Sequence, residues 1–106
     1  MPKYLFEVDY TVEGTKGLVK DGGSARRKAI EKSVKSLGGK VEVFYFTFGI
    51  RDAVVIAELP DNVTAVALSL AVSATGAVAY KTTPLITTAE VDQATKKKVT
   101  YRPPGS

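Results

Sequence analysis

The stretch KVEVFYFTFGIRDAVVIAEL, residues 40–59, decides the fold. It predicts a strand over residues 40–48, a tight turn at 49–51 and a second strand over 52–59. Two strands that are joined so closely must pair antiparallel as a hairpin. The first strand carries large apolar side chains on both faces, with Val43 and Tyr45 opposite Phe44, Phe46 and Phe48. Both faces of this hairpin therefore need to be covered.

Two further strands flank the hairpin in the sequence. Residues 3–11 alternate apolar and polar side chains with the period of two that marks a strand. Residues 77–86 give the fourth predicted strand. Pro84 near its end indicates an edge position, because proline has no N–H group to donate to a neighbouring strand.

Two main helices are predicted between the strands. The first begins at Ser24, whose hydroxyl suits a helix N-cap, and ends at the glycine pair 38–39. The second covers residues 62–75 behind a capping Asp61 and is apolar nearly all round. A weaker helical stretch is expected before the first of them, over residues 13–21.

This order of elements predicts an α+β fold, the ferredoxin-like βαββαβ arrangement with a four-stranded antiparallel sheet. Right-handed crossovers place two helices on one face of the sheet, with the spatial strand order 4-1-3-2. The other face then exposes ~500–600 Å² of apolar side chains, an area that usually marks an interface. We expect a second copy of the chain to cover it, sheet to sheet. The alternative is that strand 40–48 lies at an edge with the C-terminal tail folded over it.

The composition excludes several classes of chemistry. The 106 residues contain neither cysteine nor histidine. A thiol nucleophile, a disulfide, the commonest general base and most zinc sites are therefore absent. We expect no metal and no cofactor. No apolar run approaches ~18 residues and Lys3 leads directly into a strand, so we also expect no membrane span, no signal peptide and a cytoplasmic location.

The net charge of +4 lies in the C-terminal segment, since residues 1–95 carry equal numbers of basic and acidic side chains. We therefore divide the chain into one domain over 1–95 and a flexible basic tail over 96–106. The domain is expected to end in a short helix that begins at a capping box formed by Thr87 and Glu90. Nucleic acid is not an expected partner of the sheet, because residues 52–59 contain no aromatic side chain for stacking.

The segment GGSARR, residues 22–27, is the best local candidate for binding an anion. Its glycines can present N–H groups, a helix start adds partial positive charge, and Arg26 and Arg27 can clamp a ligand. Arg26 lies one turn before Ile30 on the apolar stripe of its helix, so we expect its head to point inward or onto a neighbouring chain. The alternative is a capped helix start in which Arg26 pairs with a structural carboxylate.

Further candidates lie on the first strand and the hairpin. Glu7 and Asp9 share the polar side of a central strand and would face the interior between two sheets, where neighbouring carboxylates can serve as acid and base. The alternative is that they pair with Lys81 or Arg51. Asp52 either binds the N–H groups of its own turn or projects into a cavity. The predicted ligand-binding residues are Ser24, Arg26, Arg27, Tyr45, Gly49 and Asp52.

Six segments resemble the GYD-domain family, in the same order along the chain. They are KYLFEVDYT (3–11), GGSARRKAIEKSV (22–34), SLGGK (36–40), FYFTFGIRD (44–52), LPDNV (59–63) and KTTPLIT (81–87). The resemblance covers about residues 3–94 of this chain. The Gly-Tyr-Asp motif that names these small bacterial and archaeal proteins is altered here, because Ile50 and Arg51 stand between Gly49 and Asp52. The resemblance implies a ferredoxin-like fold of the dimeric α+β barrel type and no established reaction.

These observations together predict a homo-oligomeric GYD-domain protein that binds a small-molecule or anionic ligand or has a structural role. The alternative is a cofactor-independent enzyme, an isomerase or a monooxygenase. Its acid or base would come from the carboxylates above or from Tyr45, and Arg26 would stabilise negative charge. An enzyme would need these side chains within ~5 Å of one another in a pocket. We assign no catalytic residue.

Overall fold

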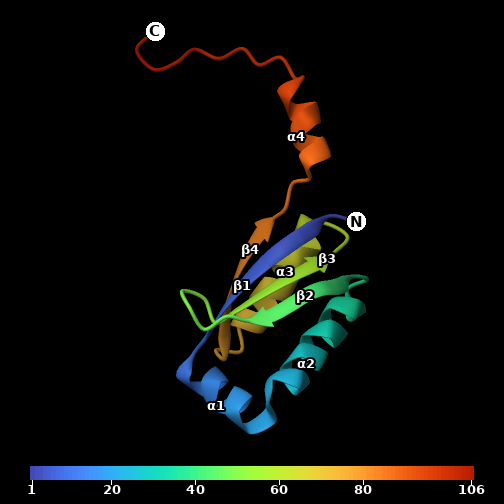
Figure 1. Ribbon diagram of the computed structural model, residues 1–106, viewed down its shortest axis with the longest axis vertical. Helices are drawn as coiled ribbons and strands as arrows, with labels where there is room; N and C mark the ends of the chain where they lie inside the picture. Colours follow the sequence, from blue (N-terminus) through green and yellow to red (C-terminus); the bar gives the residue numbers. More distant parts are fainter.

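The computed structural model describes residues 1–106, which form four strands and four helices. The strands are β1 (Lys3–Tyr10), β2 (Lys40–Phe46), β3 (Ala53–Glu58) and β4 (Val78–Pro84). The helices are α1 (Val12–Asp21), α2 (Gly23–Ser36), α3 (Asn62–Ser73) and α4 (Thr88–Thr95). Figure 1 shows that α2 and α3 run alongside the sheet, whereas α4 stands apart beyond the end of β4.

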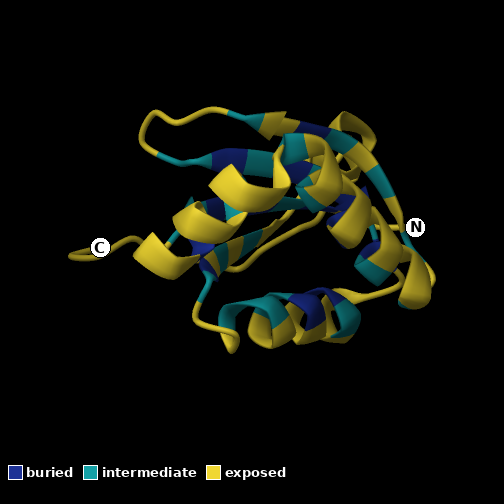
Figure 2. Ribbon diagram, turned by 90° about the horizontal axis from the view of Figure 1, so that it is seen from below, coloured by how far each residue is buried: buried dark blue, intermediate teal, exposed yellow.

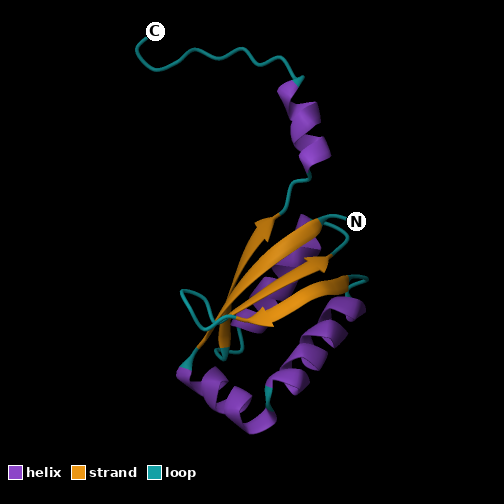
Figure 3. Ribbon diagram, viewed as in Figure 1, coloured by secondary structure: helices purple, strands orange, loops and turns teal.

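The four strands form one antiparallel sheet in the order β2-β3-β1-β4. Read from the β4 edge, this order is 4-1-3-2, and Pro84 lies in an edge strand as its chemistry requires. Figure 3 shows the strands side by side with helices at their flank. The predicted α+β class with a four-stranded antiparallel sheet is confirmed.

The hydrophobic core lies between one face of the sheet and the helices α2 and α3. A single cluster of 13 buried residues takes alternate side chains from the central strands, such as Phe6 of β1 and Val55 of β3. Ile30 of α2 and Leu68 of α3 belong to the same cluster, so both helices contribute to one core. Figure 2 shows that the outer sides of these helices are exposed.

Local hydrogen bonds explain where the helices begin. Asp61 caps α3, because its Oδ1 accepts the N–H of Thr64 at 2.8 Å, and α4 begins with the predicted capping box. Ser24 is not an N-cap, and that prediction was wrong. Gly22 takes this position without a side-chain hydrogen bond, and its φ of 84° is one that glycine adopts readily. The chain therefore breaks at Gly22, between α1 and α2.

A β-bulge in the edge strand β2 determines which of its side chains face the core. Val41 pairs with Ala57 and Val43 pairs with Ile56, so the register shifts by one residue between them. The extra residue lets Val41 and Phe44, which are three positions apart, both pack on the core. Val43 consequently lies on the opposite face.

The connection between β2 and β3 is longer than the predicted turn and covers residues 47–52. The backbone carbonyl of Asp52 accepts the N–H of Thr47 at 2.8 Å and that of Phe48 at 3.3 Å. Phe48 has a φ of 49° and is 63% exposed, although its ring stacks on Phe46 at a centroid distance of 5.6 Å. Phe48 was expected to continue the aromatic face of the strand, but the strand ends at Phe46.

The close approach of α1 to the start of β4 gives a matched pair of substitutions. A Cβ at Gly14 would lie 1.8 Å from the backbone oxygen of Ala77, whereas Gly17 on the same helix has no neighbour within 4 Å. We expect Gly14→Ala to lower the free energy of unfolding by about 1–3 kcal/mol, because the backbone must move. Gly17→Ala should raise it by up to about 1 kcal/mol, because alanine favours the helix. Urea denaturation measures both, and equal effects would contradict this close approach.

Candidate functional site

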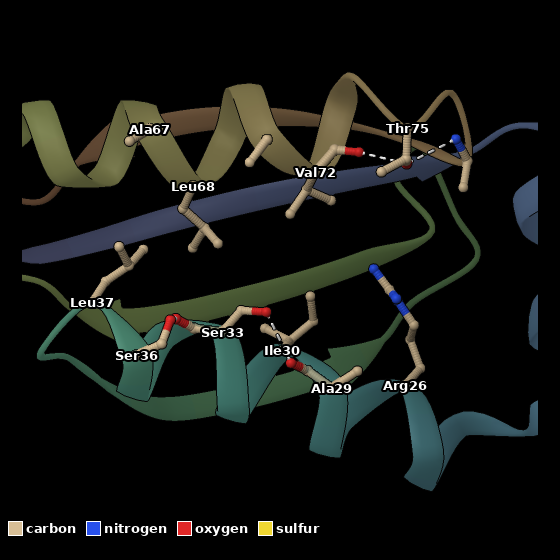
Figure 4. A pocket seen from close by; sticks show the side chains of 12 residues that line it. Arg26, Ala29, Ile30, Ser33, Ser36, Leu37, Ala67, Leu68, Val72 and Thr75 are labelled. Atoms are coloured by element: carbon tan, nitrogen blue, oxygen red, sulfur yellow. Dashed lines mark hydrogen bonds between the residues drawn. The ribbon is translucent and has the colours of Figure 1, made fainter.

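A cleft of about 560 Å³ opens between α2 and α3. Many of the side chains that line it are small, such as Ala29 and Ser33 on α2 and Ala67 on α3, and the larger lining side chains are Arg26, Ile30, Leu37, Leu68 and Val72 (Figure 4). Interiors are normally filled to high density, and these small side chains leave the space between the helices empty. The cleft is therefore a consequence of which residues line the two inner helix faces.

Arg26 supplies the positive charge of the cleft. It is half-buried, and Figure 4 shows its side chain extending from the start of α2 into the gap at one end. Arg26 takes part in none of the salt bridges of the structure. The alternative in which Arg26 pairs with a structural carboxylate is therefore wrong. Arg26 also lines a smaller cavity of about 180 Å³ between α1 and α2, where Glu13 and Asp21 are among the lining residues.

Two tyrosines from the sheet lie close to the Arg26 guanidinium. Burial raises the pKa of Tyr80 to about 12, although the neighbouring Arg26 acts to lower it. Burial also raises the pKa of Tyr10, where Arg26 opposes the rise and the Asp52 carboxylate adds to it. Both phenols are protonated at neutral pH, so each can donate a hydrogen bond beside a fixed positive charge. This combination suits a negatively charged oxygen.

No sequence motif marks these two tyrosines as site residues, because aromatic side chains in strands usually belong to the core. The sheet register is the signal that connects them. Tyr10 pairs with Val78 and Tyr80 pairs with Val8, so the two phenols lie on neighbouring positions of adjacent strands. Predicting that the two phenols lie close together would have required the correct register of β1 with β4.

The rest of the segment 22–27 does not line the cleft. Ser24 is exposed, and Arg27 is exposed and pairs with Glu31 on its own helix at 3.6 Å. Arg26 is thus the one side chain of the predicted anion-binding segment that reaches the cleft between α2 and α3.

The predicted acidic residues lie on the other face of the sheet. Arg51 binds Asp9 at 2.9 Å and Glu7 at 3.4 Å, so the alternative of ion pairing with Arg51 is confirmed. Asp52 neither binds its own turn through its side chain nor enters the cleft. Its Oδ2 accepts the backbone N–H of Tyr10 at 2.8 Å, which ties the hairpin to the end of β1.

Tyr45 and Gly49 lie outside the cleft as well. Tyr45 is 67% exposed and alternates with the buried Phe44, which places it on the face away from the helices. Gly49 lies in the β2–β3 connection, where a Cβ added to it would have no neighbouring atom within 4 Å. The enzyme alternative would use one of the carboxylates or Tyr45 together with Arg26, and none of these acid or base candidates lines the cleft that Arg26 enters.

The face of the sheet opposite the helices has an apolar centre between two groups of charges. Lys3 binds Glu42 at 2.5 Å and Glu58 at 3.7 Å at one end, and the Arg51 cluster lies at the other. The apolar residues between them are Leu5, Val43, Tyr45, Val54 and Ile56. The C-terminal tail does not fold over the β2 edge, because all residues from 96 to 106 are exposed.

The structure also bears on a metal site and on a membrane-spanning helix. No group of three or more acidic side chains is placed so that it could hold a metal ion. None of the helices has the length and apolar character that crossing a bilayer requires.

The fold and the cleft define a small α+β protein with one antiparallel sheet and an internal cleft that ends in an arginine. The family model described as GYD domain matches residues 4–95. The chain therefore belongs to the GYD domain family, and the resemblance found in the sequence is confirmed. The comparison with curated proteins finds no match, and neither does the comparison with solved structures.

The raised pKa of Tyr80 predicts a loss of stability at high pH. An unfolded tyrosine releases its proton near pH 10, whereas Tyr80 in the folded chain holds it up to about pH 12. Between these values the unfolded state binds fewer protons, so stability that is present below about pH 10 falls by about 1.4 kcal/mol per pH unit. Urea denaturation across this range should show a flatter decline for Tyr80→Phe. The same decline in Tyr80→Phe as in the exposed-site control Tyr45→Phe would refute the assignment.

Proposed function

We propose that this protein is a homo-oligomeric module that binds a small apolar molecule bearing one anionic group. The observation that carries this proposal is the half-buried Arg26, which has no carboxylate partner and stands at the end of an apolar cleft. A charge that has lost part of its hydration is stabilised by a counter-ion and by hydrogen bonds. An anion at this position would meet the guanidinium, which the phenols of Tyr10 and Tyr80 approach from the sheet without lining the cleft themselves.

The shape of the cleft narrows the class of ligand. Its volume of about 560 Å³ falls in the range typical of small-molecule sites. The hydroxyls of Ser33 and Thr75 already donate to backbone carbonyls of their own helix or turn. The cleft therefore offers mainly apolar contact, and Arg26 at one end is its one charged lining residue. An aliphatic or aromatic carboxylate fits this distribution better than a sugar, whose hydroxyls would lose hydrogen bonds.

Octanoate and octanol are a matched pair of probes for this site, because they differ in charge and share an alkyl chain. We expect Arg26→Gln to weaken octanoate binding by about tenfold to a hundredfold, the value of a charge-assisted hydrogen bond, and to leave octanol binding unchanged. Ala71→Phe should fill the cleft and weaken both. Isothermal titration calorimetry measures these affinities.

The neighbouring Arg27 provides the control. It is exposed and carries the same charge on the same helix, so Arg27→Gln should bind octanoate as the wild type does. Equal affinity of wild type and Arg26→Gln for octanoate would refute the proposed role of Arg26.

We also infer the ferredoxin-like arrangement of the dimeric α+β barrel type, in which a second copy covers the open face of the sheet. Tyr45 is 67% exposed and the other four apolar side chains at the centre of this face are partly exposed, so a symmetric pair would bury less than about 1,000 Å², a small interface. The charges of Lys3 and Arg51 with their acidic partners lie at the margin of this patch. An apolar centre with a polar rim is the usual anatomy of an interface.

Sedimentation tests this dimer. We expect wild-type protein at micromolar concentration to have twice the 11.3 kDa mass of one chain. Ile56→Lys should lower this mass, because it places a charge at the centre of the patch and breaks the sheet-to-sheet contact. Val19→Lys on α1, where Val19 is 81% exposed, is the control and should stay dimeric. A wild-type protein that sediments as a single chain would contradict the inference.

A further inference from the structure

The C-terminal arm, residues 85–106, carries apolar side chains that the rest of the chain does not cover. Ile86 is 70% exposed and Val91 is 50% exposed, and no residue of α4 is buried. Figure 1 shows α4 clear of the sheet and of the other helices. The arm contains a formed helix, α4, yet the apolar side chains of this helix have no partner in the rest of the chain.

Two local signals fix the start of α4. A helix of eight residues is otherwise marginal in water when it stands alone. Thr87 and Glu90 form a complete capping box with reciprocal hydrogen bonds. Ile86 and Val91 occupy the positions of a hydrophobic staple, one before the N-cap and one at the fourth helical residue. Local signals this strong favour a helix that acquires its remaining stability by docking.

The outward side of α3 offers a surface of the same character. Val63, Val66 and Leu70 follow one another along this side and are 79%, 47% and 65% exposed. They line a shallow groove of about 400 Å³. No charged residue occurs between Asn62 and Ser73, so the helix is apolar both toward the core and toward solvent. A helix that is hydrophobic all round is normally buried on all sides.

The root of the arm directs it away from α3 of its own chain. The N–H of Leu85 donates to the carbonyl of Lys3 at 2.9 Å, which continues the pairing of β4 with β1 past the end of the strand. The arm therefore leaves along the strand direction, in line with the sheet, whereas α3 lies in the helix layer. An arm with this exit is placed to reach a neighbouring molecule.

Charge disfavours α2 as the helix that the arm meets on that neighbour. The arm carries Lys96, Lys97 and Lys98 directly after α4. The outer side of α2 is strongly basic and would repel this run, whereas α3 is uncharged. We propose that the C-terminal arm of one copy docks, through Ile86 and Val91, on the exposed apolar side of α3 in a second copy, formed by Val63, Val66 and Leu70.

Because the chain contains no cysteine, disulfide cross-linking between introduced cysteines can be measured without interference from native thiols. One chain carries Val66→Cys and a size tag, and an untagged chain carries Val91→Cys. We expect mild oxidation of the mixture to give a tagged–untagged dimer on a non-reducing gel. The control mixture replaces Val66→Cys by Lys32→Cys, an exposed position on α2, and should give far less. Cross-linking no greater than this control would overturn the proposal.

The double variant Val66→Cys/Val91→Cys separates docking between copies from docking within one chain. If it closes a disulfide within single chains while the mixture of single variants gives no tagged–untagged dimer, the arm folds back on its own α3 and the proposal fails.

Hydrogen exchange of the α4 amides gives a second readout that does not depend on cysteine. We expect protection at high protein concentration and about tenfold faster exchange after dilution or in Val66→Asp, because an undocked helix of this length opens freely. Val19→Asp on α1 is the matched control and should keep the protection. Amides of α4 that exchange at the unfolded rate at every concentration would overturn the proposal. Val66 lies outside the cleft, so octanoate binding by Val66→Asp reports on the proposed function separately.

Discussion

In β1, Phe6 and Val8 point toward the helices while Glu7 between them points to the opposite face, because successive side chains of a strand alternate. β3 pairs with β1 in a register that sets Val55 opposite Phe6 and Ala53 opposite Val8, so both central strands present apolar side chains to the same side. A slip of one residue would turn carboxylates into the core. The core, the cleft above it and the open face behind it all depend on this register.

The two sides of the sheet differ in shape and in charge. On the helix side, small residues such as Ala29 and Ala71 leave a gap of molecular size with a positive charge at one end. On the other side, the uncovered surface is a whole sheet face, and Lys3 and Arg51 are paired there with acidic side chains of the same chain. The proposed ligand site is therefore on the helix side of the sheet, and the proposed interface between copies is on the other side.

The sequence predicts what local patterns determine. The strands, their antiparallel pairing, the Asp61 cap and the Thr87 capping box all follow from spacing and residue type, and the structure has them. The start of α2 could not be predicted in this way, because it depends on the backbone angle of Gly22 rather than on the hydroxyl of Ser24. Helical spacing placed Arg26 toward the interior, but the width of the gap depends on how two distant helices pack. The contact of Asp52 with Tyr10 likewise depends on how the hairpin lies against β1.

The bulge in β2 has a consequence for how the protein behaves at high concentration. Strands at the border of a sheet expose unpaired backbone groups, and flat borders of two molecules can join into endless ribbons. Here one border is kinked between Val41 and Val43, and the other ends at Pro84, which lacks a backbone donor. Both borders are therefore poor templates for fibril growth, which disfavours edge-to-edge polymerisation of a chain that is 44% hydrophobic.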